Sequence, residues 1–543
     1  MDKKNISGLI ISGISLSPDT EENEACIIAA EELKRAGINP ARLNFSIYKS
    51  SVDARKKNDI RLVYSVAARF EKPVSIAVPN GKKYRIAAIS DESLKINYGS
   101  EQSRSRPLVV GMGPAGLFCA LLLAENGYSP IIIDRGDRVA DRVKKYDSFC
   151  KFGILDTESN IQFGAGGAGT FSDGKLLTRI NDPKIGYVLK RFCDFGAPSD
   201  IMTAAKPHIG TDLLLGTVDN MLCEIERLGG RVMYRTRLDC ITENSDGSAT
   251  AHTSRGDIVC SSIVLATGHS SRDTYKMLLE SGYIIEAKSF SVGVRIEHLR
   301  ENIDKALYGA MAGHPRLGKG EYHLSDTTGE RGVYTFCMCP GGEIVAAASE
   351  EGGVVVNGMS RRARDGKNSN SAVAVSVRQS DYDGTPMGAI EFQRVIERKA
   401  FVCGGGDYYA PVQTVGDFLS GKSGSVPEGV LPTYRDGRVR TADMNDILPA
   451  FVCKELKLGL RSFDRKINGF ASDNALLTGV ETRTSAPVRI MRNDELVAIG
   501  KRAVYPCGEG AGYAGGITSA AIDGIRVALK IMERFAPEVS SCF

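Results

Sequence analysis

The sequence predicts an α/β protein with three structural parts, and two observations predict them. A glycine-rich strand–turn–helix pattern begins near residue 107 and a second lies close to the C-terminus, so one α/β domain would contain both. Between them, residues 285–480 alternate apolar and polar positions in short runs, which is typical of antiparallel strands. We therefore expect an N-terminal α+β domain at 1–99, the first part of the α/β domain at 107–284, an inserted antiparallel sheet at 285–480, and the return of the α/β domain at 481–543.

The N-terminal segment has the pattern of a small separate domain. Apolar runs predict strands around a helix rich in Glu and Ala, and the β-α-β-β order suggests a ferredoxin-like α+β sandwich. No catalytic motif is visible in it, so we expect it to bind a partner or to cover an active site. The polar stretch 99–106, GSEQSRSR, is predicted to be a linker. The predicted strands are 9–16, 43–48, 60–67 and 74–78, and the predicted helix is 20–36.

The strongest motif is PLVVGMGPAGLFCALLLAENGYSPIIIDRG at residues 107–136. Gly111, Gly113 and Gly116 form G-x-G-x-x-G between an apolar strand and a predicted helix, and Asp134 ends the next strand. Such glycines allow a tight turn, a close approach of backbone N–H groups to a pyrophosphate, and tight helix–strand packing. The positive helix end binds the phosphates, and the carboxylate accepts hydrogen bonds from ribose hydroxyls. The motif predicts a Rossmann-like dinucleotide site, with a purely structural turn as the alternative.

Three later stretches are predicted to complete the dinucleotide site. NIQFGAGGAGTFSDGKLL, residues 160–177, would lie as an extended loop along the phosphates, unless it is a flexible surface loop. The apolar strand 262–266 leads into A-T-G, a turn of small residues that would face the nucleotide. Residues 503–517 give a second strand and glycine turn before a helix, whose bare amides would stabilise negative charge. The residues predicted to bind the cofactor, with Arg135 and Arg142 facing the phosphates, are Gly111, Gly113, Pro114, Ala115, Gly116, Asp134, Arg135, Arg142, Gly166, Gly167, Gly169, Leu238, Ala266, Thr267, Gly268, Gly508, Glu509, Gly515, Gly516 and Ile517.

The inserted sheet is predicted to cover the cofactor and to carry the substrate pocket. One of its strands contains Cys337 and Cys339 as C-x-C, a spacing that places both thiols on one face of a regular strand. This pair is either redox active or structural, and a structural role is the preferred interpretation. The predicted strands are 291–296, 333–338, 344–348 and 373–377, and the predicted flanking helices are 389–400 and 446–458.

Composition narrows the class of protein. With 543 residues and a formal net charge of +4, the chain implies neither nucleic acid nor an anionic membrane as a main partner. No apolar run approaches the length of a membrane span. The thirteen cysteines are scattered without any C-x-x-C, and the six histidines lack ligand spacing, so we expect a cytoplasmic protein without a bound metal.

The glycine-rich stretches together resemble the glutathione-reductase-like flavoprotein superfamily. More closely, VVGMGPAGLFCALLLAENG, QFGAGGAGTFSDGKL, LATGHSSRDT, VGVRIEH, FCMCPGGEIV, GVETRTSAPVRI and YPCGEGAGYAGGI resemble a bacterial family of uncharacterised FAD-dependent dehydrogenases. The resemblance implies FAD as the cofactor, bound by the glycine units listed above, with Glu509 where many relatives have Asp. No second strand–GxGxxG–helix unit follows residue 150, so a dedicated NAD(P)H domain is not expected.

The preferred hypothesis for function is an enzyme in which bound FAD exchanges a hydride with a small organic substrate, with NAD(P)H as a conceivable external electron donor. A flavin monooxygenase and a non-catalytic sensor that binds a partner are the alternatives.

Three residues are candidates for the chemistry. Arg483 and Arg489, beside the hydroxyls of ETRTSAPVR, would bind a carboxylate or phosphate, or stabilise an anionic reduced flavin. The alternative is that both arginines form surface or interdomain salt bridges. His298 is the candidate for proton transfer, with a hydrogen-bonded structural histidine as the alternative.

Overall fold

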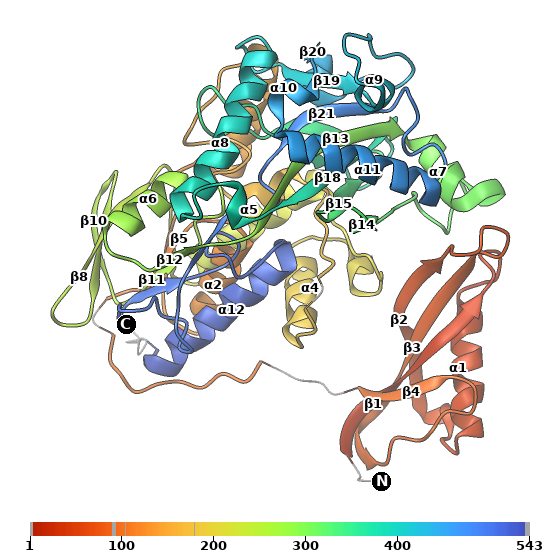
Figure 1. The fold of residues 1–543 in the computed structure, drawn as a ribbon. Helices are drawn as coiled ribbons and strands as arrows, with labels where there is room; N and C mark the ends of the chain where they lie inside the picture. Colours follow the sequence, from red (N-terminus) through yellow and green to blue (C-terminus); the bar gives the residue numbers. More distant parts are fainter. Residues whose placement is uncertain (1–3, 90–93, 104, 179, 538–543) are drawn as a thin grey trace. The chain divides into compact units, whose positions relative to one another are not determined.

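The protein forms two compact units, seen in Figure 1, which is drawn from a computed structural model that describes residues 4–89, 94–103, 105–178 and 180–537. Two segments that we predicted within the nucleotide-binding and inserted parts belong instead to the first unit. The further division of the chain into domains stays a prediction. The first unit contains Met1–Lys95, Asn181–His208 and Asp304–Gly320, and the second contains Ile96–Ile180, Ile209–Ile303 and Glu321–Phe543.

The first unit is built on a four-stranded antiparallel sheet in the order β2-β3-β1-β4. One face is covered by α1, because Ala25, Ala29 and Leu33 recur every fourth residue and form a single apolar stripe. No helix joins β3 to β4, so the ferredoxin-like β-α-β-β-α-β order is incomplete. The predicted strand 74–78 is wrong, since 74–76 end β3, and β4 was not predicted. The elements are β1 (Lys4–Leu16), α1 (Asn23–Arg35), β2 (Leu43–Asp53), β3 (Arg61–Ile76) and β4 (Arg85–Ile89).

The two distant segments complete this first core. Tyr308 and Leu317 are buried among its apolar residues, and Arg316 donates a hydrogen bond to the Tyr64 hydroxyl at 2.6 Å. Ala204 pairs with Ser50 of β2 through an isolated bridge. The segment 181–208 also carries α4 (Lys184–Asp194).

The second unit contains the predicted parallel sheet, in the order β23-β11-β5-β6-β7. Most of its residues are buried, as expected for a sheet covered on both faces. Helices α2 and α12 pack together closely because Gly524 has no side chain; a Cβ there would overlap with the Ala115 carbonyl. The elements are β5 (Leu108–Val110), α2 (Pro114–Glu125), β6 (Ile131–Ile133), α3 (Val139–Phe152), α5 (Thr211–Arg227), β7 (Arg231–Met233), β11 (Ile263–Leu265), α6 (Arg272–Glu280), β23 (Val504–Pro506) and α12 (Ile517–Arg534).

The predicted inserted sheet is present as seven strands in the order β14-β15-β18-β13-β21-β19-β20, antiparallel except for the β19–β20 pair. Helices α8 and α11 pack against it. Helix α8 begins at Pro386, where Thr385 caps the first turn by accepting from the Gly388 N–H. The elements are β13 (Phe290–Leu299), β14 (Ser325–Asp326), β15 (Val333–Cys339), β18 (Asn368–Val377), α8 (Pro386–Cys403), β19 (Ala410–Thr414), α9 (Val415–Ser420), β20 (Val439–Thr441), α10 (Met444–Ile447), α11 (Ala450–Lys466) and β21 (Leu476–Glu481). Helix α7 (Arg300–Tyr308) follows β13, and its residues from Asp304 belong to the first unit.

Smaller sheets connect these layers. A three-stranded antiparallel sheet, β10-β9-β8, follows β7, and β12 pairs with β22 next to the C-terminal glycine turn. Among the described helices, none is long and apolar enough to cross a membrane. The remaining strands are β8 (Leu238–Glu243), β9 (Ala249–Thr253), β10 (Gly256–Cys260), β12 (Ile285–Ala287), β16 (Glu343–Ala346), β17 (Val356–Met359) and β22 (Val488–Ile490).

The predicted linker is not free chain over its described part. Gly99 donates its N–H to the Met532 carbonyl at 2.8 Å, and Glu101 pairs with Phe535 in an isolated bridge. The stretch is therefore hydrogen-bonded along the end of α12.

Candidate functional site

The glycines of the first motif divide into two kinds. Gly111 has φ +106°, and a Cβ there would overlap with the Ala266 carbonyl; a Cβ at Gly116 would overlap with the Gly111 carbonyl. These two glycines are required by packing. Gly113 differs, because the nearest heavy atom to its ideal Cβ is the Gly167 Cα at 4.0 Å. Open space therefore lies in front of α2, whose N-terminal turn has no side-chain cap.

Asp134 is held rigidly at the edge of the parallel sheet. Its carboxylate accepts the N–H groups of Met112 and Gly136, both at 2.9 Å, and the residue is buried. A carboxylate has about four acceptor positions, so two bonds leave capacity for ribose hydroxyls. A cavity opens beside it and brings together five predicted residues with Thr236 and Phe163, which we did not predict. Its lining consists of Val110, Gly111, Asp134, Arg135, Phe163, Thr236, Arg237, Leu238, Thr267, Ser271 and Thr274.

The glycine-rich loop is a packed element and not a flexible surface loop. The Gly166 N–H donates to the Met112 carbonyl at 2.8 Å, and a Cβ at Gly167 would lie 3.0 Å from the Gly113 Cα. A Cβ at Gly169 would lie 3.2 Å from the Ile517 side chain. The loop therefore runs from the start of α2 to the start of α12.

Arg142 does not face the phosphates, which corrects our prediction. Its fully buried guanidinium donates to the carbonyls of Asn160, Ile161, Ala165 and Gly167, at distances that include 2.8 and 2.9 Å. Burial lowers the pKa of Arg142 to about 10. The side chain holds the glycine-rich loop from behind and acts on a ligand only through that loop.

Arg135 lines the cavity, but carboxylates already neutralise its charge. It forms ion pairs with Glu158 at 3.1 Å and with Asp273, and its guanidinium lies 4.7 Å from the Phe163 ring centre. We therefore revise its predicted role from binding phosphate to shaping the cavity wall.

The C-terminal glycine turn presents a second open helix end. The ideal Cβ positions of Gly515 and Gly516 have no heavy atom within 4 Å, and α12 begins at Ile517 without a side-chain cap. Gly508 packs against Ala115, with 2.7 Å between its ideal Cβ and the Ala115 Cβ. The Gly508 N–H donates to Asp523 at 2.7 Å, which fixes the turn on α12.

A polar cluster lies at this turn and contains two residues that we did not predict. His269 lies 3.6 Å from Glu509, and its buried Nε2 has no partner among the described residues. Burial, followed by Arg489, lowers the pKa of Lys288, and Glu509 opposes this shift. Arg489 lies over Tyr513 at 5.3 Å, and its buried Nε likewise has no described partner. The position of His269 directly after A-T-G was the available sequence signal; Lys288 had none.

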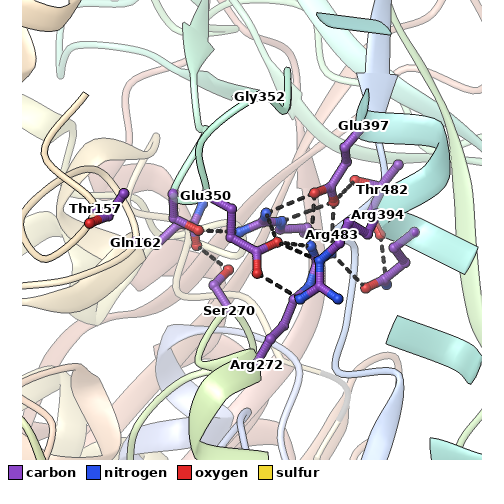
Figure 2. A network of polar contacts seen from close by, with 12 residues as sticks. Thr157, Gln162, Ser270, Arg272, Glu350, Gly352, Arg394, Glu397, Thr482 and Arg483 are labelled. Carbon is purple, nitrogen blue, oxygen red and sulfur yellow. Dashed lines mark hydrogen bonds and ion pairs between the residues drawn. The ribbon is translucent and has the colours of Figure 1, made fainter. Parts of the chain in front are cut away.

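Arg483 is not placed to bind a substrate, and Figure 2 shows why. Its guanidinium donates to both oxygens of Glu397, at 3.1 and 2.9 Å. Arg272 donates to the same carboxylate at 2.9 and 2.7 Å and also pairs with Glu350. Both arginines hold the pKa of the buried Glu397 carboxyl far below its ordinary value, against the effect of burial. We call Arg272, Arg483, Glu350 and Glu397 the arginine cluster. Its ion pairs agree with the alternative hypothesis for Arg483, namely that this arginine forms salt bridges and does not bind an anion.

His298 is also placed in a structural role. The residue is 3% exposed, and its Nε2 lies 2.6 Å from the Phe470 carbonyl. Burial lowers the pKa of His298 to about 4, so the imidazole is neutral at physiological pH. Its ring packs on Phe470 at 4.9 Å. These contacts correct the prediction that it transfers a proton.

The open glycines, the cavity beside Asp134 and the unpartnered His269 Nε2 fit a bound dinucleotide. Comparison with known proteins gives the class. A family model described as "FAD-dependent protein, C-terminal domain-like" matches residues 289–484, and a domain of unknown function (DUF8436) matches residues 10–69. An uncharacterised protein of Clostridium beijerinckii is 46% identical over 97% of this chain and 98% of its own length.

The chain therefore belongs to a family of uncharacterised FAD-dependent proteins, and its cofactor is FAD. Among solved structures, CtdE in complex with FAD is 11% identical, covers 80% of this chain and 87% of its own, and gives a TM-score of 0.33. Glycine oxidase from Geobacillus kaustophilus is 10% identical, covers 81% and 98%, and also gives 0.33. Because these TM-scores are low, the activities in the names of these proteins are not transferred to this chain. Among the described residues, no group of three or more His, Cys, Asp or Glu side chains could hold a metal ion.

Proposed function

We propose that this protein is an oxidoreductase that transfers a hydride between bound FAD and a small organic substrate. One observation carries the proposal: α2 and α12 begin beside the same glycine-rich loop, and both first turns are uncapped and open. Two positive helix ends at one site suit the negative charge of a pyrophosphate and of a reduced flavin ring.

The residues that would hold FAD follow from this arrangement. Asp134 would bind the adenosine ribose within the cavity, and the backbone at Gly113 would bind the pyrophosphate. The Gly516 amide and the first N–H groups of α12 would face the flavin end, whereas the Gly515 N–H already donates to the Ser519 hydroxyl at 3.1 Å. When bound there, FAD supplies two-electron chemistry, and the chain orients it and excludes water.

Of the three residues predicted to take part in the chemistry, Arg489 remains the candidate for binding an anion. It has no carboxylate within ion-pairing distance among the described residues, and it lies beside the C-terminal glycine turn. Its guanidinium would bind a substrate carboxylate or the anionic edge of a reduced flavin, with Lys288 adding positive charge. An external donor such as NAD(P)H, and a cytoplasmic location, are parts of the same proposal.

The first test asks whether the space at Gly113 is the pyrophosphate site. Valine fits the backbone there, because Gly113 has φ −74° and ψ 179°, but its side chain fills the open space. We expect Gly113→Val to weaken FAD binding at least about a hundredfold, a loss of about 2.7 kcal/mol. Fluorescence titration of the apoprotein measures this affinity, and circular dichroism checks the fold.

Gly216→Val is the matched control, since nothing lies within 4 Å of the Gly216 Cβ position in α5. It should bind FAD as the wild type does. Equal affinity of the Gly113 and Gly216 variants would contradict the assignment.

The second test addresses the reaction. Anaerobic mixing of the holoprotein with NAD(P)H and a metabolite library should reveal a donor that bleaches the flavin absorbance. We expect Arg489→Ala to raise the KM for an anionic donor about tenfold or more, and Arg489→Lys to restore part of the loss. An unchanged KM would show that Arg489 does not bind the donor. If the reaction is repeated in air, oxygen incorporated into a product would identify a monooxygenase instead.

A further inference from the structure

Cys337 and Cys339 lie at a distortion of the inserted sheet. The pairing of β15 with β18 shifts register between Phe336 and Cys339, and Cys337 has φ +45°. A non-glycine residue in this region costs about 1–2 kcal/mol, and such residues are enriched at functional sites. The bulge also breaks the regular alternation of the strand. The Cys339 thiol donates to the Cys337 carbonyl at 3.4 Å and lies within hydrogen-bonding reach of the Cys337 thiol.

Two cations from distant parts of the chain meet at these thiols. The Lys175 Nζ lies 3.9 Å from the Cys339 sulfur and also donates to the Met338 carbonyl. The Arg295 Nη2 lies 3.6 Å from the same sulfur and donates to the Cys337 carbonyl at 2.6 Å. Each cation also has one carboxylate: Asp173 lies 2.7 Å from Lys175, and Glu481 lies 3.0 Å from Arg295. We call these six residues, Asp173, Lys175, Arg295, Cys337, Cys339 and Glu481, the thiol cluster.

The electrostatics of the cluster distinguish the two sulfurs. The hydrogen bond from Cys339 lowers the pKa of Cys337, and Lys175 and Arg295 lower it further, against the effect of burial. The pKa of Cys339 is raised, first by its hydrogen bond to Cys337 and then by burial. In contrast, burial alone dominates at Cys260 and raises its pKa to about 12. Cys337 is the less buried residue of the pair, and it is also the one whose thiolate these neighbours favour.

The thiol cluster is also linked to the second open helix end. Leu176, the neighbour of Lys175, accepts a hydrogen bond from the Thr518 hydroxyl at 2.7 Å. Thr518 belongs to the first turn of α12, beside the amides assigned to the flavin. The adjacent residues Lys175 and Leu176 therefore contact the thiol cluster on one side and the proposed flavin end on the other.

We propose that Cys337 and Cys339 form a redox-active dithiol whose substrate class is a small-molecule disulfide. The Cys337 thiolate attacks one sulfur of R–S–S–R, so that a Cys337–S–S–R bond forms and RS⁻ leaves. Cys339 loses its proton to solvent and attacks the Cys337 sulfur, releasing the second RS⁻. The pair loses two electrons, the disulfide gains them, and two protons yield two RSH.

The return of the pair to the dithiol needs two electrons and two protons. Reduced flavin is a donor of that class, and this return step is the only one that rests on the proposed function. The exchange step itself is a property of the cysteines.

The test follows one peptide of the holoprotein. Trypsin should release residues 332–361, which contain Cys337 and Cys339 and no other cysteine. The reduced protein is treated with hydroxyethyl disulfide, quenched in acid and analysed by mass spectrometry. We expect this peptide to lose two hydrogens before the exposed Cys223 and Cys240 form mixed disulfides. Cys339→Ser should instead accumulate the mixed disulfide on Cys337.

Either of two outcomes would overturn the proposal: both thiols of the peptide stay free while Cys223 and Cys240 react, or the wild type stops at a mixed disulfide. No flavin reduction is involved, so a failure here is separate from a failure of the proposed function. A holoprotein that exchanges disulfides but whose flavin no donor reduces would refute only the proposed function.

A second measurement tests the cations. Lys175→Met should shift the pH profile of Cys337 alkylation by iodoacetamide about one unit upward, which is about a tenfold lower rate at pH values well below the pKa of Cys337. Lys175→Arg should restore the profile, while a merely structural effect would lower the rate equally at every pH. An unshifted Lys175→Met profile would contradict the role of Lys175 as the positioning cation.

Discussion

The arginine cluster and the thiol cluster are both largely buried. Each places two cations together and joins segments that are far apart in sequence. In the first, each guanidinium donates to both oxygens of Glu397. In the second, Lys175 and Arg295 each have one carboxylate and also approach sulfur at 3.9 and 3.6 Å. The first arrangement leaves its charges satisfied, whereas the second places positive charge beside a pair of ionisable thiols.

The comparison shows that a cation's partners, more than its residue type, decide whether it is available for chemistry. Arg483 has the residue type expected of an anion-binding site, yet Glu397 occupies its donors. Cys337 lies in a sequence pattern typical of an ordinary strand. In the structure, however, its backbone has a positive φ, and a hydrogen bond from Cys339, together with Lys175 and Arg295, lowers its pKa. Four predictions test this contrast.

The largest effect is expected from Glu397→Gln. The change leaves Arg272 and Arg483 buried with much less negative charge, and breaking such a pair costs about 3–5 kcal/mol. Chemical denaturation of the holoprotein should show this loss of unfolding free energy. Glu391→Gln is the control, because its side chain is about half exposed and should cost less than about 1 kcal/mol. Similar losses for both variants would show that the arginine cluster does not hold this region together.

A smaller effect is expected from Gly358→Ala. A Cβ at Gly358 would overlap with the Arg295 guanidinium, which Glu481 and Asn370 hold in place. Overpacking of this kind costs about 1–3 kcal/mol. The displaced cation should also slow Cys337 alkylation at pH values below the pKa of Cys337. Unchanged alkylation in a destabilised but folded variant would separate Arg295 from the electrostatics of the thiol.

The two clusters should respond to pH in opposite directions. The pKa of Glu397 is lowered, so its stabilisation is present above the unfolded value of about 4.3 and is lost as pH falls below it. Burial raises the pKa of Glu481 to about 7, so its stabilisation is full below about 4.3 and is lost as pH rises through about 7. The stability of the wild type relative to Glu481→Gln should therefore fall from pH 5 to pH 8. A difference that stays flat over this range would contradict the raised pKa.

The smallest effect on stability is expected from Cys337→Ser. The residue is partly exposed, and the substitution keeps a hydroxyl in place of the thiol, so the loss should be about 1 kcal/mol or less. Thermal unfolding measures it, with Cys260→Ser as the fully buried comparison that should lose more. A large loss at Cys337 would favour the structural interpretation of the C-x-C pair.

Much of the fold could be predicted because its signals are local. The segment 107–136 contains its strand, glycines, helix and acid in one stretch, and the structure places Gly111, Gly113, Gly116 and Asp134 around one edge of the sheet. The runs 291–296, 333–338 and 373–377 fall within β13, β15 and β18. The boundary errors arose at β3, which continues through the charged stretch 69–72 past the predicted end, and at the two segments that return to the first unit.

The sequence by itself determined the cofactor class, because backbone turns that bind phosphates depend on glycines at fixed short spacings. Only the tertiary structure decided which charges meet. Arg272 and Glu397 are 125 positions apart, and Lys175 and Cys339 are 164 apart, so no local pattern records either contact. The environment of a buried charge depends on every group packed around it, and that packing brings together strands and loops from the whole unit. For this reason Arg483 and Arg489, six residues apart, have one ion-paired and one unpaired guanidinium among the described residues.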